Sequence, residues 1–364
     1  MTAPRPQPAP APQAAIGPQA ATAPQPAAGP PPAYPFSAIV GQEEMRRTLI
    51  LAAVDPRIGG VLILGDRGTG KSTAVRALAA LLPPIEAVEG CPVNSARLAD
   101  VPDWADPRPG PGLRTMPTPV VDLPLGVSED RVTGALDIER ALIEGVRAFQ
   151  PGLLARANRG FLYVDEVNLL EDHVVDLLLD AAQSGETVVE REGLSIRHPS
   201  RFVLVGSGNP EEGELRPQLL DRFGLAVDAQ TPTDIEARVE VIRRRDAFDR
   251  DPLAFAARWG AEDAALRERI LAARARLGAV EAPEAALRDC AALCVALGSD
   301  GLRGELALLR AARALAALEG EAAVEREALR AVAPSALRHR LRRDPLDEAG
   351  SAARVERAMA EAWA

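Results

Sequence analysis

Short apolar runs alternate with helical patterns over the first two thirds of the chain. Three of these runs, at residues 61–64, 161–164 and 202–205, contain no charged residue and end at glycine or polar residues. Such runs are typical of strands buried on both faces of a parallel sheet. The segments at 74–82 and 173–183 carry apolar residues at helical spacing. The alternation predicts an α/β domain whose parallel sheet is covered by helices on both faces.

Weaker patterns predict the remaining elements of this part of the chain. They are a helix at 42–54, a short strand at 85–88, a helix at 137–147, a β-hairpin with arms at 187–190 and 194–197, and a last strand at 225–228. Residues 91–126 are rich in Pro, Gly and Asp, so we expect an irregular connection there. A connection of this length inside an α/β domain is usually an insertion with a function.

Composition divides the chain into three parts. Residues 1–35 are nearly all Pro, Ala and Gln and cannot bury enough apolar surface to fold, which predicts a disordered or polyproline-like tail. Residues 36–232 hold the predicted nucleotide-binding α/β domain with its insertions. Residues 233–364 are rich in Ala, Leu, Arg and Glu, which predicts a separate all-helical C-terminal domain.

The strand predicted at 61–64 leads into a glycine-rich loop and then into a helix. Glycines in such a loop let backbone N–H groups surround a pyrophosphate, the lysine reaches the outer phosphates, and the serine hydroxyl binds Mg²⁺. The positive end of the helix faces the same anion. A turn that binds nothing is the alternative, and the flanking strand and helix argue against it. The predicted site for ATP and Mg²⁺ consists of Gly65, Asp66, Arg67, Gly68, Thr69, Gly70, Lys71, Ser72 and Thr73.

Two carboxylates follow the apolar run at 161–164. Nucleotide hydrolysis needs a group that holds the metal and a group that orients the attacking water. Asp165 and Glu166 suit these roles because ligand sites of parallel sheets lie at the carboxyl ends of the strands. Ser72 and Asp165 are therefore the predicted metal ligands, and Glu166 is the residue predicted to polarise water. The alternative is a pair of solvated carboxylates in an exposed turn.

Three further residues are candidates for the same reaction. Asn209 ends the strand predicted at 202–205, and its amide could reach the terminal phosphate or the water, although a turn-forming Asn before Pro is the simpler interpretation. Arg222 lies before the last strand and could stay on its own surface or stabilise transition-state charge in a neighbouring subunit. Arg303 begins a helix in the C-terminal part and could touch nucleotide, or be one of many solvated arginines.

Charge and hydropathy narrow the class of protein. The net charge is −10 and aromatic residues make up only 3% of the chain, which disfavours a protein that grips nucleic acid through phosphate contacts and base stacking. No apolar run approaches the ~20 residues of a membrane span. The first residues lack the features of a secretory signal, so we expect a cytoplasmic protein.

Cysteines and histidines are too few and too scattered to form a predicted metal or porphyrin site. The chain has three cysteines, which cannot build a disulfide framework. Cys290 and Cys294 lie four residues apart, and small buried apolar residues are a better interpretation of them than metal ligands. The three histidines, His173, His198 and His339, show no ligand spacing. We therefore expect this chain not to hold a porphyrin itself.

Several segments together resemble AAA+ ATPases and, more narrowly, the ATPase (I) subunits of magnesium chelatases, which belong to the helix-2-insert clade. The generic segments are 65–72, 164–170, 206–211 and 215–224. The more family-specific stretch runs from 133–139 through 149–157. The resemblance covers the chain from about residue 36 to its end and leaves only the Pro/Ala tail outside.

This resemblance implies a function and a set of roles. It implies an ATPase motor in the enzyme that inserts Mg²⁺ into protoporphyrin IX, a ligase of (bacterio)chlorophyll biosynthesis. It assigns Asn209 to sensor 1, Arg222 to an arginine finger that acts across a subunit interface, and Arg303 to sensor 2. It matches the region after residue 91 to the helix-2 insertion and 187–197 to the hairpin before sensor 1. It also implies a homo-oligomeric ring, a hexamer, that works with the D subunit and the porphyrin-binding H subunit.

Three alternatives remain open from sequence. A MoxR-like chaperone for metal-cofactor insertion shares the same motor. A nucleic-acid motor or transcription activator shares the ATPase core, but the acidic balance disfavours it and the insertion lacks a Gly-Ala-Phe-Thr-Gly-Ala loop. A scaffold that binds nucleotide without turnover is the third. It predicts that Glu166→Gln changes nothing.

Overall fold

The computed structural model describes residues 32–105, 112–143, 145, 148–191, 194–213, 215–299, 301–341 and 351–363. Of the tail predicted at 1–35, residues 1–31 lie outside this set. Tyr34 packs against Phe248 and Phe255, with ring centroids 5.1 and 5.4 Å away. The folded part therefore includes residues that composition alone assigns to the tail.

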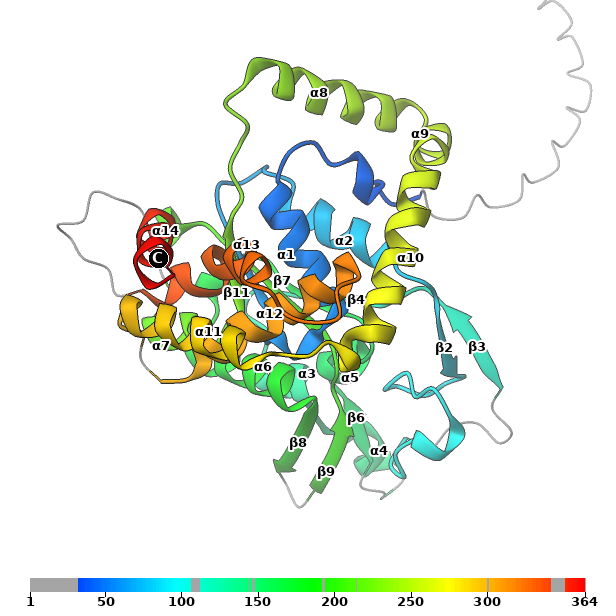
Figure 1. The fold of residues 1–364 in the computed structure, drawn as a ribbon. Helices are drawn as coiled ribbons and strands as arrows, with labels where there is room; N and C mark the ends of the chain where they lie inside the picture. The colour runs from blue at the N-terminus through cyan, green and yellow to red at the C-terminus, as the bar shows by residue number, and fades with distance from the viewer. Residues whose placement is uncertain are drawn as a thin grey trace, which may run out of the picture.

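The centre of the molecule is a five-stranded parallel sheet in the order β11-β1-β10-β7-β4. Figure 1 labels β11, β7 and β4 of this sheet among the helices that surround it. The strands of this sheet are β1 (Val61–Leu64), β4 (Val120–Leu123), β7 (Phe161–Val164), β10 (Val203–Gly208) and β11 (Leu225–Asp228). The four expected strands at 61–64, 161–164, 202–205 and 225–228 are present within a residue or two at each end, except that β10 continues to Gly208.

The strand expected at 85–88 is present, but the expectation of an irregular connection at 91–126 is wrong, because two strands lie within it. The segment expected as a strand, β2 (Ile85–Val88), pairs with β3 (Leu113–Met116) in a separate two-stranded antiparallel sheet. The fifth strand of the central sheet is β4, which lies inside the stretch expected to be irregular. An edge strand has only one neighbour, so β4 tolerates an exposed Asp122. The Asp122 carboxylate pairs with Arg76 of α2 (Lys71–Leu81) at 2.9 Å.

Helices cover both faces of the sheet, as the alternation of patterns predicts. One face packs against α1 (Glu43–Val54) and α2 (Lys71–Leu81) through Val61, Ile63 and their neighbours on the other strands. The other face packs against α5 (Leu153–Ala157) and α6 (Asp172–Ser184). Alternate side chains of each strand serve opposite faces, which is why the strands are apolar throughout.

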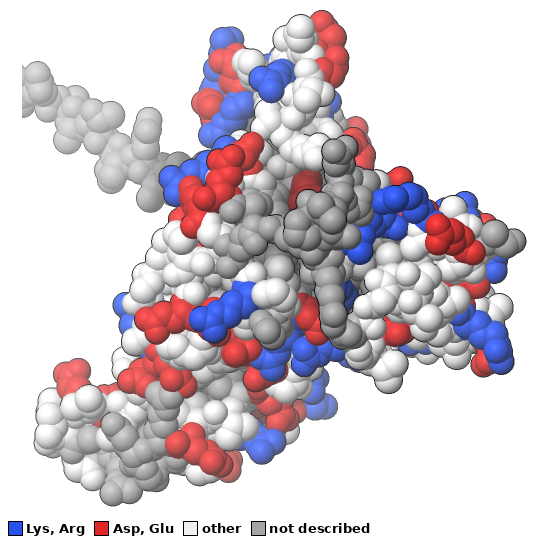
Figure 2. All heavy atoms as spheres, turned by 90° about the vertical axis from the view of Figure 1, so that its left-hand side faces the viewer, with Lys and Arg blue, Asp and Glu red and all other residues white. Residues whose placement is uncertain are grey.

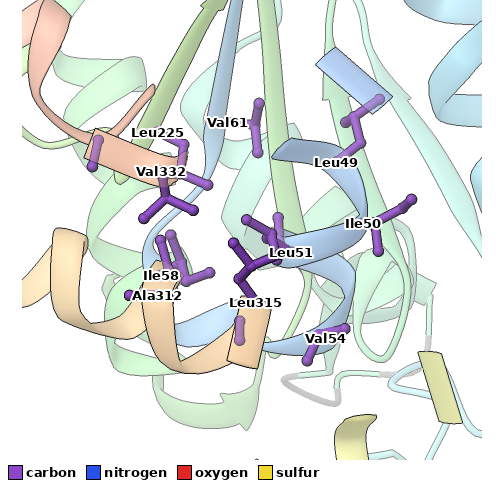
Figure 3. Packing of buried hydrophobic residues seen from close by; sticks show 14 of the residues in the cluster. Leu49, Ile50, Leu51, Val54, Ile58, Val61, Leu225, Ala312, Leu315 and Val332 are labelled. Atoms are coloured by element: carbon purple, nitrogen blue, oxygen red, sulfur yellow. The ribbon is translucent and has the colours of Figure 1, made fainter. Parts of the chain in front are cut away.

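Most of the C-terminal helices share a core with the sheet. The C-terminal helices are α8 (Ile235–Arg250), α9 (Pro252–Arg258), α10 (Gly260–Arg276), α11 (Glu284–Leu297), α12 (Arg303–Glu319), α13 (Arg326–Leu337) and α14 (Ser351–Ala362), and their buried residues in this core come from α10 to α14. Figure 3 shows Ala312 and Leu315 of α12 and Val332 of α13 beside Leu51 of α1 and Leu225 of β11. The helical part expected to be separate is therefore packed onto the α/β part through one continuous set of buried side chains.

Smaller elements extend from this body. They are α3 (Glu129–Thr133), β5 (Gly134–Leu136), α4 (Ile138–Ile143), β6 (Phe149–Pro151), α7 (Pro217–Leu220), and the expected hairpin, which is β8 (Glu186–Arg191) with β9 (Leu194–Pro199). The helix expected at 137–147 is the shorter α4, and residues 144, 146 and 147 lie outside the described set. No helix in the described ranges is both long enough and apolar enough to cross a bilayer.

Candidate nucleotide site and arginine cluster

The loop between β1 and α2 has the backbone of a phosphate-binding loop. Gly68 and Gly70 have φ angles of 81° and 82°, which glycine adopts without the strain of a side chain. Gly65 lies so close to the end of β11 that a Cβ atom there would be 2.2 Å from the Ala229 carbonyl oxygen. The loop therefore needs glycine at these positions, and α2 begins directly after it at Lys71.

Lys71 points back over the loop. Its ammonium group donates to the Asp66 carbonyl oxygen at 2.9 Å and also to the Gly65 carbonyl oxygen. Burial lowers the pKa of Lys71, and the carboxylates of Asp165 and Asp66 oppose this shift. A cation that is partly removed from water and held at the mouth of the loop is suited to meet the outer phosphates of a nucleotide.

Asp165 is oriented by two side chains that the sequence analysis missed. The Ser207 hydroxyl lies 2.6 Å and the Tyr163 hydroxyl 3.0 Å from Asp165 Oδ1. Burial, followed by the negative charge of Asp165, raises the pKa of Tyr163 and keeps its hydroxyl protonated as a donor. Tyr163 offered a signal, since its polar group lies inside an apolar run, whereas Ser207 lies beyond the strand predicted at 202–205 and offered none.

Glu166 has an unusual backbone and a charged partner. Its φ of 54° places a non-glycine residue in the left-handed region two residues after the end of β7. Arg67 of the phosphate loop donates to Glu166 Oε1 at 2.7 Å and pairs with Glu212 at 3.0 Å. These carboxylates raise the pKa of Arg67, with Glu166 contributing most. The predicted water-polarising carboxylate is thus linked to the loop that would carry the phosphates.

Asn209 lies at the cavity, but its side-chain oxygen also has a local role. That oxygen accepts a hydrogen bond from the Glu211 N–H at 3.1 Å and caps the short turn that follows β10. The turn-forming interpretation of Asn209 therefore holds in the structure. The residue nevertheless stands beside Gly208 in the wall of the cavity described next.

Most of the predicted site residues line one cavity of about 500 Å³. The phosphate loop forms one wall, and the carboxyl ends of β7 and β10 form the other. The lining residues are Arg67, Gly68, Thr69, Gly70, Lys71, Ser72, Thr73, Tyr163, Asp165, Glu166, Ser207, Gly208 and Asn209. The structure therefore brings together residues that are more than a hundred positions apart in sequence, at the sheet edge where ligands of parallel sheets bind.

A second, more apolar cleft of about 470 Å³ adjoins the same loop. Ile39 and Val40, which precede α1, form one side, and Val241 and Ile242 of α8 form the other. Gly68, Thr69, Gly70 and Thr73 are shared by both cavities. The sequence analysis missed this cleft because nothing in the pattern of α8, which has no buried residue, indicates that it stands over the loop.

Arg222 and Arg303 lie together, away from the phosphate loop of their own chain. Both line two adjoining cavities between α6, α7 and α12, and neither lines the cavity at the loop. Arg222 pairs with Asp176 and Asp180 of α6, and its side chain is 20% exposed. Within one chain the structure therefore groups the two arginines with each other and not with Lys71.

The donor set at the loop fits a magnesium ion that is shared with a nucleotide. No group of three or more His, Cys, Asp or Glu side chains within the described ranges could hold a metal ion. Ser72 and Asp165 offer one hydroxyl and one carboxylate on opposite walls of the cavity. Mg²⁺ is commonly held by one or two such protein ligands, with phosphate oxygens and waters completing its octahedron.

A phosphate loop after a central parallel strand, an acidic pair on a nearby strand and a C-terminal helical region define a P-loop ATPase of the AAA+ class. The family comparison agrees, since residues 287–359 match the AAA lid domain and residues 35–101 and 137–228 match magnesium chelatase, subunit ChlI. The chain belongs to the magnesium chelatase subunit I family.

Individual relatives support this assignment. The chain is 73% identical to the magnesium-chelatase 38 kDa subunit of Cereibacter sphaeroides, over 90% of this chain and 98% of the relative. It is 54% identical to the chloroplastic magnesium-chelatase subunit ChlI of rice, Oryza sativa subsp. japonica, over 87% of this chain and 78% of the relative. Both a bacterium and a plant therefore provide named relatives.

Solved structures give the same picture. A chain in a model of the complex between subunits BchI and BchD of magnesium chelatase is 68% identical, with a TM-score of 0.55, covering 90% of this chain and 99% of that one. A putative ATPase from Cytophaga hutchinsonii shares the fold at 18% identity, with a TM-score of 0.61, covering 89% of this chain and 91% of that one.

Proposed function

We propose that this chain is the ATP-hydrolysing motor of a magnesium chelatase, which drives insertion of Mg²⁺ into protoporphyrin IX held by a partner subunit. The observation that carries the ATPase part is the single cavity in which Lys71, Ser72, Asp165 and Glu166 meet. Membership of the subunit I family carries the chelatase part. The same membership favours this function over that of a MoxR-like chaperone.

The residues of the cavity divide the work of hydrolysis. The N–H groups of the glycine-rich loop and Lys71 bind the phosphates, and the start of α2 adds its positive end. Ser72 and Asp165 would hold Mg²⁺, which neutralises phosphate charge when it is bound. Ser207 and Tyr163 keep Asp165 in one orientation. Glu166 accepts hydrogen bonding from the attacking water, and the neighbouring apolar cleft accommodates the adenine ring.

The two arginines are proposed to act on the nucleotide of a neighbouring copy. Arg222 and Arg303 do not reach the loop of their own chain, yet they lie together on one face. A head-to-tail ring brings such a face against the neighbour's open site at every interface. We therefore propose a homo-oligomeric ring, a hexamer, in which Arg222 stabilises transition-state charge and Arg303 contacts nucleotide across the interface.

Partners supply what this chain lacks. The relative solved with BchD supports a D-type subunit as one partner. A porphyrin-binding H-type subunit is proposed as the other partner. We expect this chain not to hold the porphyrin itself, because His198 is buried and His173 pairs with Glu171 on the surface. Mg²⁺ gives up its water reluctantly, so exported work from ATP turnover would help its insertion. The cytoplasmic location remains a prediction from sequence.

Nucleotide binding tests the first step of this proposal. Lys71→Ala removes the cation at the phosphates, so we expect binding of ATP with Mg²⁺ to weaken by tenfold or more, measured by titration calorimetry. Unchanged binding would contradict the proposed site.

A nucleic-acid motor is the rival interpretation, and it predicts that DNA stimulates ATP hydrolysis by this protein. On the face shown in Figure 2, basic and acidic side chains are interspersed and form no single basic patch, which argues against that interpretation.

A further inference from the structure

The turn that carries Arg222 is held by the C-terminal helical region. This turn, residues 221–223, connects α7 to β11 and is far in sequence from the short 3-10 turn Arg338–Arg340 that follows α13. The two turns nevertheless contact each other through side chains that no sequence pattern singles out. The contact joins the turn that carries the proposed arginine finger to the C-terminal helical region.

Arg340 makes most of this contact. Its guanidinium donates to Asp221 Oδ1 at 2.5 Å, to the Asp221 carbonyl oxygen, and to the Phe223 carbonyl oxygen at 2.7 Å. His339 Nε2 lies 2.9 Å from the same Phe223 carbonyl. Only 3% of the Arg340 side chain is exposed, so these charge-assisted hydrogen bonds are shielded from water. They fix the backbone on both sides of Arg222.

Arg303 adds a second attachment to the same turn. Its Nη1 donates to Asp221 Oδ2 at 3.2 Å, so the Asp221 carboxylate bridges two arginines of the C-terminal region. Removal of Arg340 would leave this carboxylate with one half-exposed partner and would free the Phe223 carbonyl from its strongest donor. Because Arg222 lies between these two anchor points, its backbone would then be held only by the bonds of its own turn and by Gln183, which donates to the Arg222 carbonyl oxygen at 3.2 Å.

We propose that Arg340 is a positioning residue for Arg222, and that it couples the placement of this finger to the C-terminal helices of the same chain. The inference rests on the proposed function, specifically on Arg222 acting in the site of a neighbouring subunit. A misplacement of about 1 Å can cost a catalytic group roughly a hundredfold in rate. Loss of Arg340 should therefore lower hydrolysis in the neighbour's site while leaving its own phosphate loop intact.

Arg338 provides a matched control on the same short turn. Its side chain is 10% exposed and pairs with Asp228 and with Glu44 of α1, so it also ties the C-terminal region to the sheet. It makes no contact with residues 221–223 among its described hydrogen bonds. Arg338→Gln should thus show how much ATP hydrolysis falls when this turn is loosened in general. Arg340→Gln should show how much it falls when the contact with the Arg222 turn is lost.

The experiment measures ATP hydrolysis by full-length variants, alone and mixed in equal amounts before assembly. Arg340→Gln alone should lower kcat by about ten- to a hundredfold with KM for ATP within about twofold, because only transition-state placement is lost. Arg338→Gln should keep kcat within about threefold of wild type. Arg340→Lys, which keeps the charge but not the fork of donors, should behave like Arg340→Gln and serves if the latter does not fold.

Mixing separates an effect on the finger from an effect on the variant's own site. Arg340→Gln mixed with Glu166→Gln should regain activity at about a quarter of the interfaces, where an intact finger meets an intact site. Arg340→Gln mixed with Arg222→Ala should regain none, since both carry defective fingers. The opposite pair of results would overturn the inference and place the effect of Arg340 in its own nucleotide site.

A reference mixture separates failure of the inference from failure of the proposed function. Arg222→Ala mixed with Glu166→Gln should regain activity if Arg222 acts across the interface. An inactive reference mixture would contradict that proposed role. An active reference mixture with an Arg340 variant that does not follow the same pattern would overturn only the positioning role of Arg340.

Discussion

Among single residues, Ser207 makes the shortest contact with Asp165, the proposed metal ligand. Its hydroxyl donates to Asp165 Oδ1 at 2.6 Å, and the hydroxyl oxygen accepts a hydrogen bond from the Glu166 N–H at 3.3 Å. Asp165 could be predicted from sequence because it ends an apolar run. Ser207 could not, since a serine inside a strand carries no pattern that reveals its partner.

We predict that Ser207→Ala raises the Mg²⁺ concentration needed for half-maximal ATP hydrolysis by about tenfold, because side chains that orient metal ligands typically contribute that much. Measuring hydrolysis as a function of Mg²⁺ checks this. Ser335→Ala is the control, since Ser335 is also buried and bonds only within its own helix. An unchanged Mg²⁺ dependence in Ser207→Ala would show that Asp165 needs no such support.

His339 predicts a dependence of stability on pH. Burial, with help from Arg340, lowers its pKa from 6.5 to about 3, and its Nδ1 has no partner and no access to water. The unfolded chain therefore takes up a proton below pH 6.5 that the folded chain refuses. Keeping His339 neutral therefore costs no unfolding free energy above pH 6.5, and the free energy of unfolding decreases as the pH falls from 6.5 towards 3.

Replacement of His339 by Gln should remove this part of the pH dependence. Between pH 7 and pH 5 the wild type should lose about 2 kcal/mol more unfolding free energy than His339→Gln, since each pKa unit corresponds to about 1.4 kcal/mol. Urea unfolding at several pH values measures the difference. Parallel pH curves for the two proteins would contradict the buried neutral state.

At the scale of elements, burial decides what sequence can predict. The buried strands β1, β7 and β10 were predictable because both of their faces must be apolar. β4 was not, because an edge strand accepts Asp122 and neighbouring prolines without loss of pairing. The helices of the C-terminal region were predictable as helices, but their packing onto α1 and β11 depends on long-range contacts that periodicity does not encode.

Helix α8 contributes an element-scale prediction. None of its residues is buried, yet Val241 and Ile242 line the apolar cleft beside the phosphate loop. Ile242→Arg should weaken ATP binding by about tenfold while leaving kcat within about twofold, because the cleft contacts a part of the substrate that does not react. Fluorescence titration with an ATP analogue and steady-state kinetics measure the two quantities.

Val239→Lys is the matched control for this prediction. Val239 lies on the same helix with an exposed fraction of 37%, and it does not line the cleft. The Val239→Lys variant should bind ATP as tightly as the wild type does. Equal weakening by both substitutions would show that the helix, and not the cleft, is what they disturb.

For the whole molecule, the sequence predicted residues that line one cavity, but it did not predict the arginine cluster. Lys71 and Asp165 each carry a local pattern, and the parallel sheet brings them together. Arg340 lies in an arginine-rich helical region where one arginine resembles another, so its buried contact with the Arg222 turn had no sequence signal. The proposed action of Arg222 on a neighbouring copy depends on that contact, because it ties the Arg222 turn to the C-terminal helical region.

The most direct measurement of the central claim is formation of Mg-protoporphyrin by this protein with D- and H-type partners, ATP and Mg²⁺, followed by fluorescence. The claim predicts product with the wild type, none when this protein is alone, and none with Glu166→Gln, which should still bind ATP. Product at the wild-type rate with Glu166→Gln, or product without the partners, would contradict the claim that this chain cleaves ATP to do work on another polypeptide.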